Sequence, residues 1–254
     1  LKAAPKLCPV TLELGGKNPN IIMSDADLEI AIPGVIDGMR YTRQGQACTA
    51  GSRVYIHEKI YDKVLNGAVE KLSKLKMGNA MDESSDIGAI ISEEQLKRTL
   101  YYMDIAKKNP STKILHGGNQ SKGGEYRDGF YYEPTLLSGL PVSSPICQEE
   151  VFGPVACAIP FKSFDEVMKS ANDTQFGLSA VLWTKDLSRA LQFVDEIEAG
   201  FVQVNQCVAP RANVSYGGIK MSGLGKEYAF DSMMNHFTQS KTVLINRGKS
   251  NIDV

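Results

Sequence analysis

The sequence predicts an α/β protein in which helices cover a mainly parallel sheet. Helix-like and strand-like segments alternate along the C-terminal part of the chain, as helix 164–172, strand 180–183, helix 187–197 and strand 201–204. This alternation is typical of parallel strands joined by helical crossovers. The 254 residues are 43% hydrophobic and 22% charged, which suits one large globular domain or two small ones.

The N-terminal segments fit this class. Residues 8–14 predict a short strand that ends at two glycines beginning with Gly15, where the missing Cβ atoms allow a tight turn and close approach of another group. Residues 20–23 predict a second strand, and residues 27–44 predict a helix. Pro33 lies inside that helix and removes a backbone donor, so we expect a kink or a late start.

The middle of the chain continues the pattern. Residues 53–57 predict a strand, and residues 59–76 predict an amphipathic helix because apolar side chains recur every three or four positions. A second helix is predicted over 92–108, followed by a strand at 113–115. The glycine- and charge-rich residues 117–129 predict a surface loop.

Composition excludes several classes of function. A net charge of −1 gives no general attraction to nucleic acid, and no apolar run is long enough for a membrane span. The five cysteines contain no CxxC pair, so we expect neither a disulfide framework nor a zinc site, and a reducing, cytoplasmic location fits best. The three histidines are scattered, and we predict no metal site.

One cysteine stands out by its neighbours. Cys48 lies within residues 45–53 (GQACTAGSR), between a helix-like and a strand-like segment. Small side chains around it leave room for a substrate carbon to reach the sulfur, and nearby peptide N–H groups are suited to stabilise an oxygen that gains charge. A free thiol has a pKa of about 8.5, and its thiolate is a strong nucleophile. A lone cysteine is more often a buried, inert side chain.

Three further stretches favour the catalytic interpretation. They are residues 12–17 (LELGGK), 149–154 (EEVFGP) and 216–223 (YGGIKMSG). In this order, and together with residues 45–53, they resemble the aldehyde dehydrogenase superfamily over essentially the whole chain. This resemblance is highly specific for the superfamily and much less specific for a substrate.

The resemblance implies two catalytic roles. Cys48 matches the nucleophile that adds to the aldehyde carbonyl. Glu13 matches the general base that activates water to hydrolyse the resulting thioester, which implies a carboxylic acid as product. The resemblance also implies that the backbone N–H of Cys48 forms half of an oxyanion hole. Glu227 resembles a glutamate that relays or orients protons behind the base.

The resemblance also implies a nicotinamide cofactor, NAD or NADP. Glu150 matches a carboxylate that accepts hydrogen bonds from the nicotinamide ribose, and Phe152 matches a ring that lies against the nicotinamide. We expect the two side chains to lie on one side of an extended segment, with Glu149 pointing away. Gly15 is expected to leave room for the cofactor. Lys226 replaces an arginine found in many relatives, which puts bidentate contacts in doubt.

The resemblance divides the chain into residues 1–15, the end of a cofactor-binding domain, residues 16–235, a catalytic domain, and residues 236–254, an oligomerisation strand with its tail. A strand predicted at 242–245 would join the sheet of a neighbouring subunit, giving a dimer or tetramer. We expect the chain to be a piece of a longer enzyme, and the piece alone to be inactive. The partners expected are a small aldehyde and further copies of the chain, without nucleic acid or membrane.

Two other classes of function remain open at this point. A non-catalytic relative, comparable to the lens crystallins of the same superfamily, would have no reason to keep both Cys48 and Glu13. A cysteine hydrolase would need a base aimed at the sulfur, and His57 is the nearest candidate. A strand separates His57 from Cys48, so we consider it poorly placed.

Overall fold

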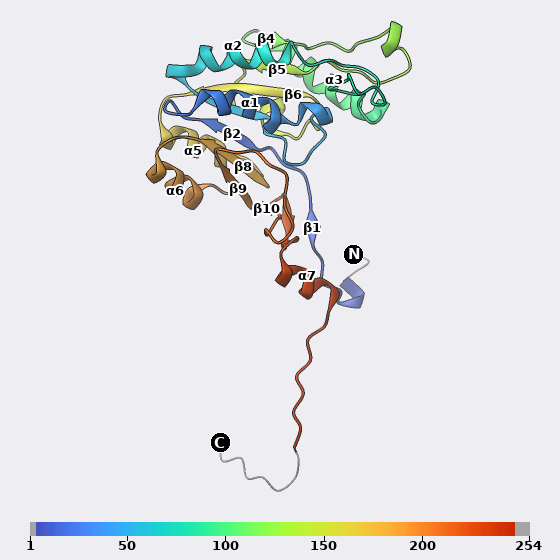
Figure 1. The fold of residues 1–254 in the computed structure, drawn as a ribbon, viewed down its shortest axis with the longest axis vertical. Coiled ribbons are helices and arrows are strands. Elements are labelled where there is room, and N and C mark those ends of the chain that lie inside the picture. Colours follow the sequence, from blue (N-terminus) through green and yellow to red (C-terminus); the bar gives the residue numbers. More distant parts are fainter. Residues whose placement is uncertain (1–3, 247–254) are drawn as a thin grey trace.

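The computed structural model describes residues 4–246 and contains a seven-stranded sheet in the order β4-β5-β6-β3-β2-β8-β9 (Figure 1). The strands are β2 (Pro19–Ile22), β3 (Arg53–His57), β4 (Lys113–His116), β5 (Thr135–Ser138), β6 (Val155–Phe161), β8 (Ser179–Trp183) and β9 (Phe201–Val204). Neighbouring strands are parallel throughout, except that β4 is antiparallel to β5. The sheet is therefore mainly parallel, and the predicted α/β class is confirmed.

Helices cover both faces of this sheet. They are α1 (Leu28–Met39), α2 (Tyr61–Leu72), α3 (Glu93–Lys108), α4 (Pro145–Gln148), α5 (Phe164–Asn172) and α6 (Leu187–Glu196). Side chains of α1 and α2 form one buried cluster with one face of the sheet, and side chains of α3 to α6 form two clusters with the other face. Strands β2, β3, β5 and β8 are buried along their whole length, as expected for parallel strands covered on both sides.

Strands β5 and β6 are absent from our prediction. The seven residues of β6 include Pro160, which argues against a central strand because proline donates no backbone hydrogen bond. In the structure the N–H of Cys157 donates to Ser52 on the β3 side, so Pro160 faces the β5 side. The pairing of β5 with β6 ends at Ala158, and Pro160 therefore has no neighbouring strand whose hydrogen bond it would break.

Helix α1 differs from its prediction. It begins at Leu28, with Asp27 capping Glu29, and continues through Pro33 to Met39. Arg40, in the left-handed conformation, ends it, and the 3₁₀-helix η2 (Tyr41–Arg43) follows. The predicted extension to residue 44 was therefore wrong, because the helix ends at a left-handed cap well before the next strand.

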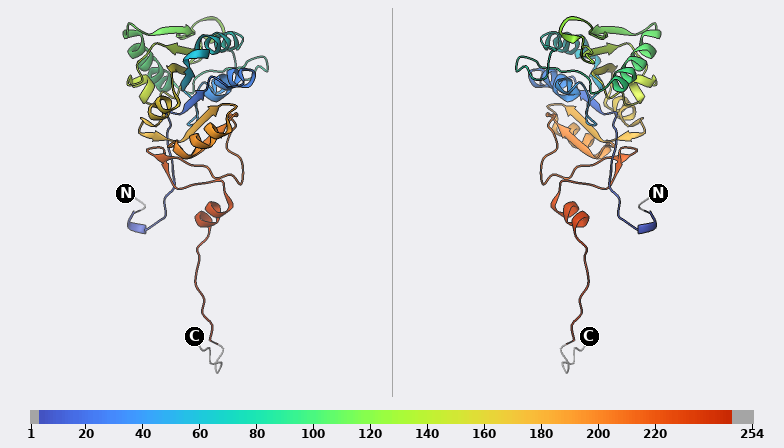
Figure 2. Two further views of the ribbon diagram at one scale, coloured as in Figure 1. Left: turned by 90° about the vertical axis from the view of Figure 1, so that its left-hand side faces the viewer. Right: turned by 90° about the vertical axis from the view of Figure 1, so that its right-hand side faces the viewer.

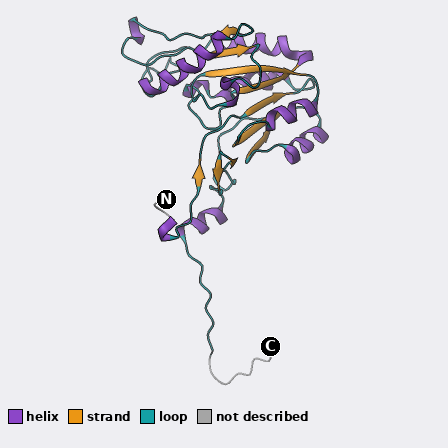
Figure 3. Cartoon of the chain, turned by 180° about the vertical axis from the view of Figure 1, so that it is seen from behind, coloured by secondary structure: helices purple, strands orange, loops and turns teal. Residues whose placement is uncertain are grey.

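Residues 4–14 and 223–246 extend away from the seven-stranded sheet (Figures 1 and 2). Two short antiparallel pairs lie outside that sheet, β1 (Leu12–Glu13) with β11 (Gly223–Leu224), and β7 (Phe176–Gly177) with β10 (Ile219–Lys220). The strand predicted over residues 8–14 was therefore too long, since within the described residues only Leu12 and Glu13 pair with another strand there. Helix α7 (Phe230–Phe237), which we did not predict, follows β11 and leads to an extended segment, as Figure 3 shows from behind.

The C-terminal segment 238–246 forms no strand within the single chain. The strand predicted at 242–245 requires a partner from another subunit, so its pairing stays a prediction. The boundary expected between residues 235 and 236 falls inside α7. Within residues 4–246, no helix has the length and apolar character needed to cross a membrane. No group of three histidine, cysteine or acidic side chains in the same residues is placed to hold a metal ion.

Candidate active site

Cys48 lies on the loop that joins η2 to β3, at the amino end of that strand. Its side chain is half-buried and packs against Leu178, Phe201 and Tyr216. Leu178 directly precedes β8 and Phe201 begins β9, so amino ends of several parallel strands meet around the sulfur. The thiol is thus held by the apolar edge of the sheet while part of its surface remains accessible.

The backbone of the Cys48 loop is fixed by Asn18. The Asn18 side-chain amide donates to the carbonyl oxygens of Cys48, at 2.7 Å, and Ala50, at 2.9 Å, and its oxygen accepts from the N–H of Ser179 at 2.9 Å. Gly16 allows this approach, because a Cβ there would lie 2.5 Å from the Cys48 carbonyl oxygen. Asn18 therefore ties the amino ends of β2, β3 and β8 together around the thiol.

The N–H of Cys48 differs from that of its neighbour Ala50 in its hydrogen bonding. Within the described part of the chain, this N–H donates to no protein acceptor, whereas the N–H of Ala50 bonds to Ala47 at 3.0 Å. An N–H without a protein partner beside a nucleophile is suited to an oxygen that gains charge during attack.

Tyr216 contacts the sulfur directly. Its hydroxyl oxygen lies 3.4 Å from Sγ of Cys48, although 168 positions separate the two residues. The Tyr216 ring is buried and makes edge contacts with Phe201 and Tyr228. Our prediction included Tyr216 only as the first residue of a motif. Its meeting with Cys48 depends on the folding of the C-terminal loop over β9.

Glu13 lies beside the segment that carries Tyr216. One carboxylate oxygen lies 2.9 Å from the point where a Cβ on Gly217 would stand. Partial burial raises the pKa of the Glu13 carboxyl, the nearby charge of Glu227 raises it further, and Lys226 acts in the opposite direction. A carboxylate with a raised pKa is a better proton acceptor near neutral pH.

Glu227 and Lys226 reach this region from the segment between β11 and α7. The backbone of Glu227 exchanges two hydrogen bonds with Tyr216, at 3.0 and 2.7 Å. The ammonium group of Lys226 donates to the carbonyl oxygen of Gly217. A single lysine donor thus contacts the backbone beside Glu13, and its charge favours the ionised form of that carboxylate.

Glu150 lies against the glycine pair that precedes β2. Its Oε1 accepts from the N–H of Gly16 at 2.9 Å, and its Oε2 lies 2.5 Å from the point where a Cβ on Gly15 would stand. Burial raises the pKa of the Glu150 carboxyl, and the Gly16 hydrogen bond lowers it. Glu149 points elsewhere and accepts from the hydroxyl of Tyr102 at 2.6 Å.

Phe152 departs from the extended geometry that we expected. Its φ is +56°, in the left-handed region that a non-glycine residue adopts rarely. The amide of Gln95 donates to the carbonyl oxygens of Val151, at 2.9 Å, and Phe152, at 2.8 Å, and so supports this turn from α3. The prediction of an extended backbone from Glu150 to Phe152 was therefore wrong, since the backbone turns at Phe152.

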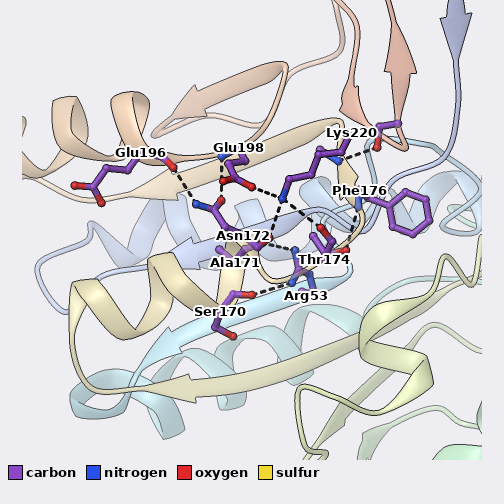
Figure 4. Close-up of polar contacts among 11 residues, drawn as sticks. Arg53, Ser170, Ala171, Asn172, Thr174, Phe176, Glu196, Glu198 and Lys220 are labelled. Atoms are coloured by element: carbon purple, nitrogen blue, oxygen red, sulfur yellow. Dashed lines mark hydrogen bonds and ion pairs between the residues drawn. The ribbon is translucent and has the colours of Figure 1, made fainter.

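Two basic side chains tie the end of α5 to neighbouring segments (Figure 4). Lys220 of β10 donates to the carbonyl oxygens of Asn172, at 2.8 Å, and Thr174, at 3.2 Å, and pairs with the carboxylate of Glu198. Positive charge at a helix C-terminus is favourable. Because β10 follows Tyr216 in the chain, these contacts hold in place the segment that presents Tyr216 to Cys48.

Arg53, the second of these side chains, is completely buried beneath the site. Its guanidinium donates to the carbonyl oxygens of Lys17, at 2.9 Å, Ser170, at 3.2 Å, and Ala171, at 2.8 Å. These contacts connect the glycine pair before β2, the start of β3 and the end of α5. Arginine suits this position because its guanidinium presents five donors in a rigid plane.

His57 is separated from Cys48. It ends β3, about 13 Å along the strand from Arg53 at the usual rise per residue. Its Nδ1 accepts from the N–H of Lys59 at 3.2 Å, and its ring packs edge-on against Phe161. Cys48 lies before the first residue of β3 and His57 is its last, so His57 is poorly placed to act as a base on the sulfur.

Similarity to known proteins decides the family. The family model described as "Aldehyde dehydrogenase family" matches residues 1–243. The chain belongs to the aldehyde dehydrogenase family. This confirms the resemblance carried by the four sequence motifs.

Individual aldehyde dehydrogenases agree with the family match. The chain is 39% identical over 249 residues to an aldehyde dehydrogenase of Rhodospirillum rubrum, which covers 96% of this chain and 48% of that protein. It is 38% identical over 248 residues to a betaine aldehyde dehydrogenase of Brucella melitensis, covering 98% of this chain and 50% of that protein. The chain thus spans about half the length of the curated relatives it matches.

Solved structures of the family share the fold. The NAD+ complex of an aldehyde dehydrogenase from Bacillus cereus superposes with a TM-score of 0.87 at 36% identity, over 92% of this chain and 47% of that one. An NAD+ complex of betaine aldehyde dehydrogenase from Staphylococcus aureus gives a TM-score of 0.87 at 35% identity, over 92% of this chain and 46% of that one.

Asn18 is the site residue that our prediction missed altogether. Its type and its place beside the glycine pair were visible in the sequence. Its three hydrogen-bond partners come from distant segments, however, and no local pattern identifies them. Tyr216 was visible as part of a motif, but its contact with the sulfur was not.

Proposed function

We propose that the protein carrying this chain oxidises an aldehyde to a carboxylic acid with NAD as the hydride acceptor. One observation carries the proposal. Cys48 contacts Tyr216 and Glu13 lies beside the next residue, Gly217, in a chain of the aldehyde dehydrogenase family. A nucleophile and a carboxylate that accepts protons are the two groups that thioester formation and hydrolysis require.

In the first step, the Cys48 thiolate forms a bond from sulfur to the carbonyl carbon, and the electron pair of the carbonyl π bond moves to the oxygen, which takes up the negative charge. The free N–H of Cys48 stabilises that oxygen. Bound NAD supplies the acceptor for the hydride that leaves this carbon, and a thioester to Cys48 remains.

In the second step, Glu13 takes a proton from water as the water oxygen bonds to the thioester carbon. The carbon–sulfur bond then breaks, the sulfur leaves as a thiolate and the acid is released. The raised pKa of Glu13 suits this role. Glu227, joined to Tyr216 through the backbone and close to Glu13, passes the proton on towards solvent.

Gly15 and Glu150 are suited to bind a nicotinamide nucleotide. The Gly16 hydrogen bond is made by Oε1 of Glu150, so Oε2 remains available to a ribose hydroxyl. Gly15 lets the Glu150 carboxylate lie against the backbone, because any Cβ there would overlap it. Phe152 lies two residues further along and would offer its ring to the nicotinamide. We favour NAD over NADP because two solved relatives are NAD+ complexes.

The wider setting of the enzyme is part of the same proposal. All five cysteines are free, which suits a reducing compartment such as the cytoplasm. The exposed apolar side chains of α7 and the segment after it suit contact with further copies of the chain, in a dimer or tetramer.

Replacing Cys48 by Ala tests the proposal in the protein expressed from its full open reading frame. Wild-type protein is expected to form NADH from NAD and a panel of aldehydes. The variant is expected to lose that activity by at least a thousandfold and to keep its fold, because Ala occupies less space than Cys. Cys207→Ala is the matched control. NADH formation by Cys48→Ala at the wild-type rate would refute the assignment, whereas a wild-type protein inactive on every aldehyde would favour a crystallin-like, structural role.

A further inference from the structure

The contact between Tyr216 and Cys48 is not used by the chemistry above. We propose that Tyr216 is a positioning residue for Cys48, whose hydroxyl donates a hydrogen bond to the sulfur and stabilises its thiolate. This inference rests on the proposed function in taking Cys48 as the nucleophile. It adds a group that acts on the sulfur rather than on the aldehyde or the cofactor.

The direction of the hydrogen bond follows from the surroundings of the tyrosine. The 3.4 Å contact is compatible with either atom as donor. Burial raises the pKa of Tyr216 above its usual value, and the contact with Cys48 and the charge of Glu13 act in the same direction. The phenol therefore keeps its proton through the neutral range, and a thiolate beside it can only accept.

The hydroxyl is held in place before any substrate binds. Tyr216 is 6% exposed, and its ring meets Phe201 at 5.5 Å and Tyr228 at 5.7 Å, both edge-on. Its backbone is bonded to Glu227 on both sides. A donor fixed in this way loses little conformational freedom when it bonds to the sulfur.

The charged groups around the pair do not replace this donor. Glu13 and Glu227 are both acidic and offer the sulfur no donor when ionised, and the ammonium of Lys226 is bonded to the Gly217 carbonyl. Asn18 bonds to the carbonyl of Cys48 and not to its sulfur. Among the described residues, Tyr216 is thus the one whose side chain makes a hydrogen bond with Sγ of Cys48.

The hydrogen bond would act both when the sulfur attacks the aldehyde and when it leaves the thioester. A hydrogen bond to a charged sulfur is stronger than one to a neutral sulfur, so it favours the nucleophilic form. It weakens as the sulfur loses charge in forming the bond to carbon. It strengthens again when the thioester breaks, because the sulfur regains charge as the leaving group. Tyr216 therefore assists hydrolysis without touching the acyl carbon.

Tyr216→Phe removes the hydroxyl and keeps the ring, and Tyr228→Phe removes a neighbouring hydroxyl as a matched control. The readout is the rate of Cys48 alkylation by iodoacetamide as a function of pH, in the protein from the full open reading frame. Trypsin releases Cys48 in the peptide of residues 44–53, which contains no other cysteine, so mass spectrometry follows this thiol alone. Circular dichroism checks that each variant is folded.

Tyr216→Phe is expected to move the pH of half-maximal alkylation up by about one unit, the effect of losing one hydrogen bond to a charged group. Each thiolate then becomes about threefold more reactive, because nucleophilicity rises with basicity. Alkylation should be about threefold slower at neutral pH and about threefold faster on the alkaline plateau. Tyr228→Phe should follow the wild-type curve.

A Tyr216→Phe curve that coincides with wild type would overturn the proposal, because a tyrosine that merely packs against the sulfur would give that result. A downward shift would overturn it too, since it would mean that the thiol donates to the phenol. The alkylation assay needs neither aldehyde nor NAD. Its outcome is therefore separate from the NADH assay, whose failure would count against the proposed function instead.

Discussion

Glu13 shows how neighbouring charges set the behaviour of a single side chain. Burial raises the pKa of its carboxyl most, Glu227 raises it further and Lys226 lowers it. The base is active when deprotonated, so thioester hydrolysis is lost as the pH falls through this raised pKa. The acid limb of the activity profile is therefore expected above the ordinary range of a glutamate.

Replacing Glu13 by Gln is expected to slow thioester hydrolysis by about a hundredfold or more, the usual effect of losing a general base. The Cys48 thiol is untouched, so the first turnover should remain fast. A rapid-mixing experiment should then show a burst of NADH followed by slow turnover.

Glu227→Gln serves as the comparison for Glu13→Gln. It removes a negative charge that raises the pKa of Glu13, so the acid limb of turnover should move to lower pH. If Glu13→Gln shows neither a burst nor a loss of turnover, another group is the base.

At the scale of elements, helix α1 depends on how closely it approaches β8. Gly34 faces the ring of Trp183, and a Cβ there would lie 2.1 Å from a ring carbon. The ring cannot easily move away, because Trp183 is buried and its Nε1 donates to Asn20 at 2.7 Å. Gly34 is therefore needed for packing, in spite of the low helix propensity of glycine.

Gly34→Ala is expected to lower the free energy of unfolding by about 2 kcal/mol, since overpacking outweighs the gain in helix propensity. Gly67→Ala in α2 is the matched control, because the nearest atom to its Cβ would be the terminal Cδ1 of the Ile32 side chain, at 2.8 Å rather than 2.1 Å. Urea denaturation followed by circular dichroism measures both variants. Equal midpoints for the two would show that Trp183 moves aside without cost.

At the scale of the whole molecule, the C-terminal end leaves apolar side chains uncovered. Phe237 is 79% exposed on α7, and Val243, Leu244 and Ile245 are 63%, 92% and 79% exposed on the extended segment. Consecutive exposed apolar residues in an extended segment are suited to pairing with another sheet. The sheet has two edge strands, β4 and β9, at which a segment from a second copy of the chain can pair.

Deleting residues 241–254 from the full protein is expected to convert the oligomer to monomers or aggregates, because the pairing segment is lost. Light scattering coupled to gel filtration measures the mass of each form. Replacing Val243 and Ile245 by Ser would show whether the apolar side chains themselves are needed. An oligomer of unchanged mass after the deletion would contradict the prediction.

The sequence by itself determined the α/β class and the family, because alternating periodicity and short motifs are local properties of the chain. Helices α2, α3, α5 and α6 and strands β2, β3, β8 and β9 were recognisable for the same reason. Strand β6 was not, since Pro160 is acceptable only because β5 ends before reaching it. The residues expected at the site were identified from motifs, and their roles stay predictions.

Only the tertiary structure decided where those motifs meet. Residues around Cys48, Gly16 and Glu150 gather at the amino ends of β2, β3 and β6, an edge that no local pattern specifies. Tyr216 meets the sulfur across 168 positions, and Asn18 joins three strands. Such contacts depend on strand order and on chain reversals far away in sequence. A residue type can therefore reveal that a group is able to react, while the fold determines which partner it reacts beside.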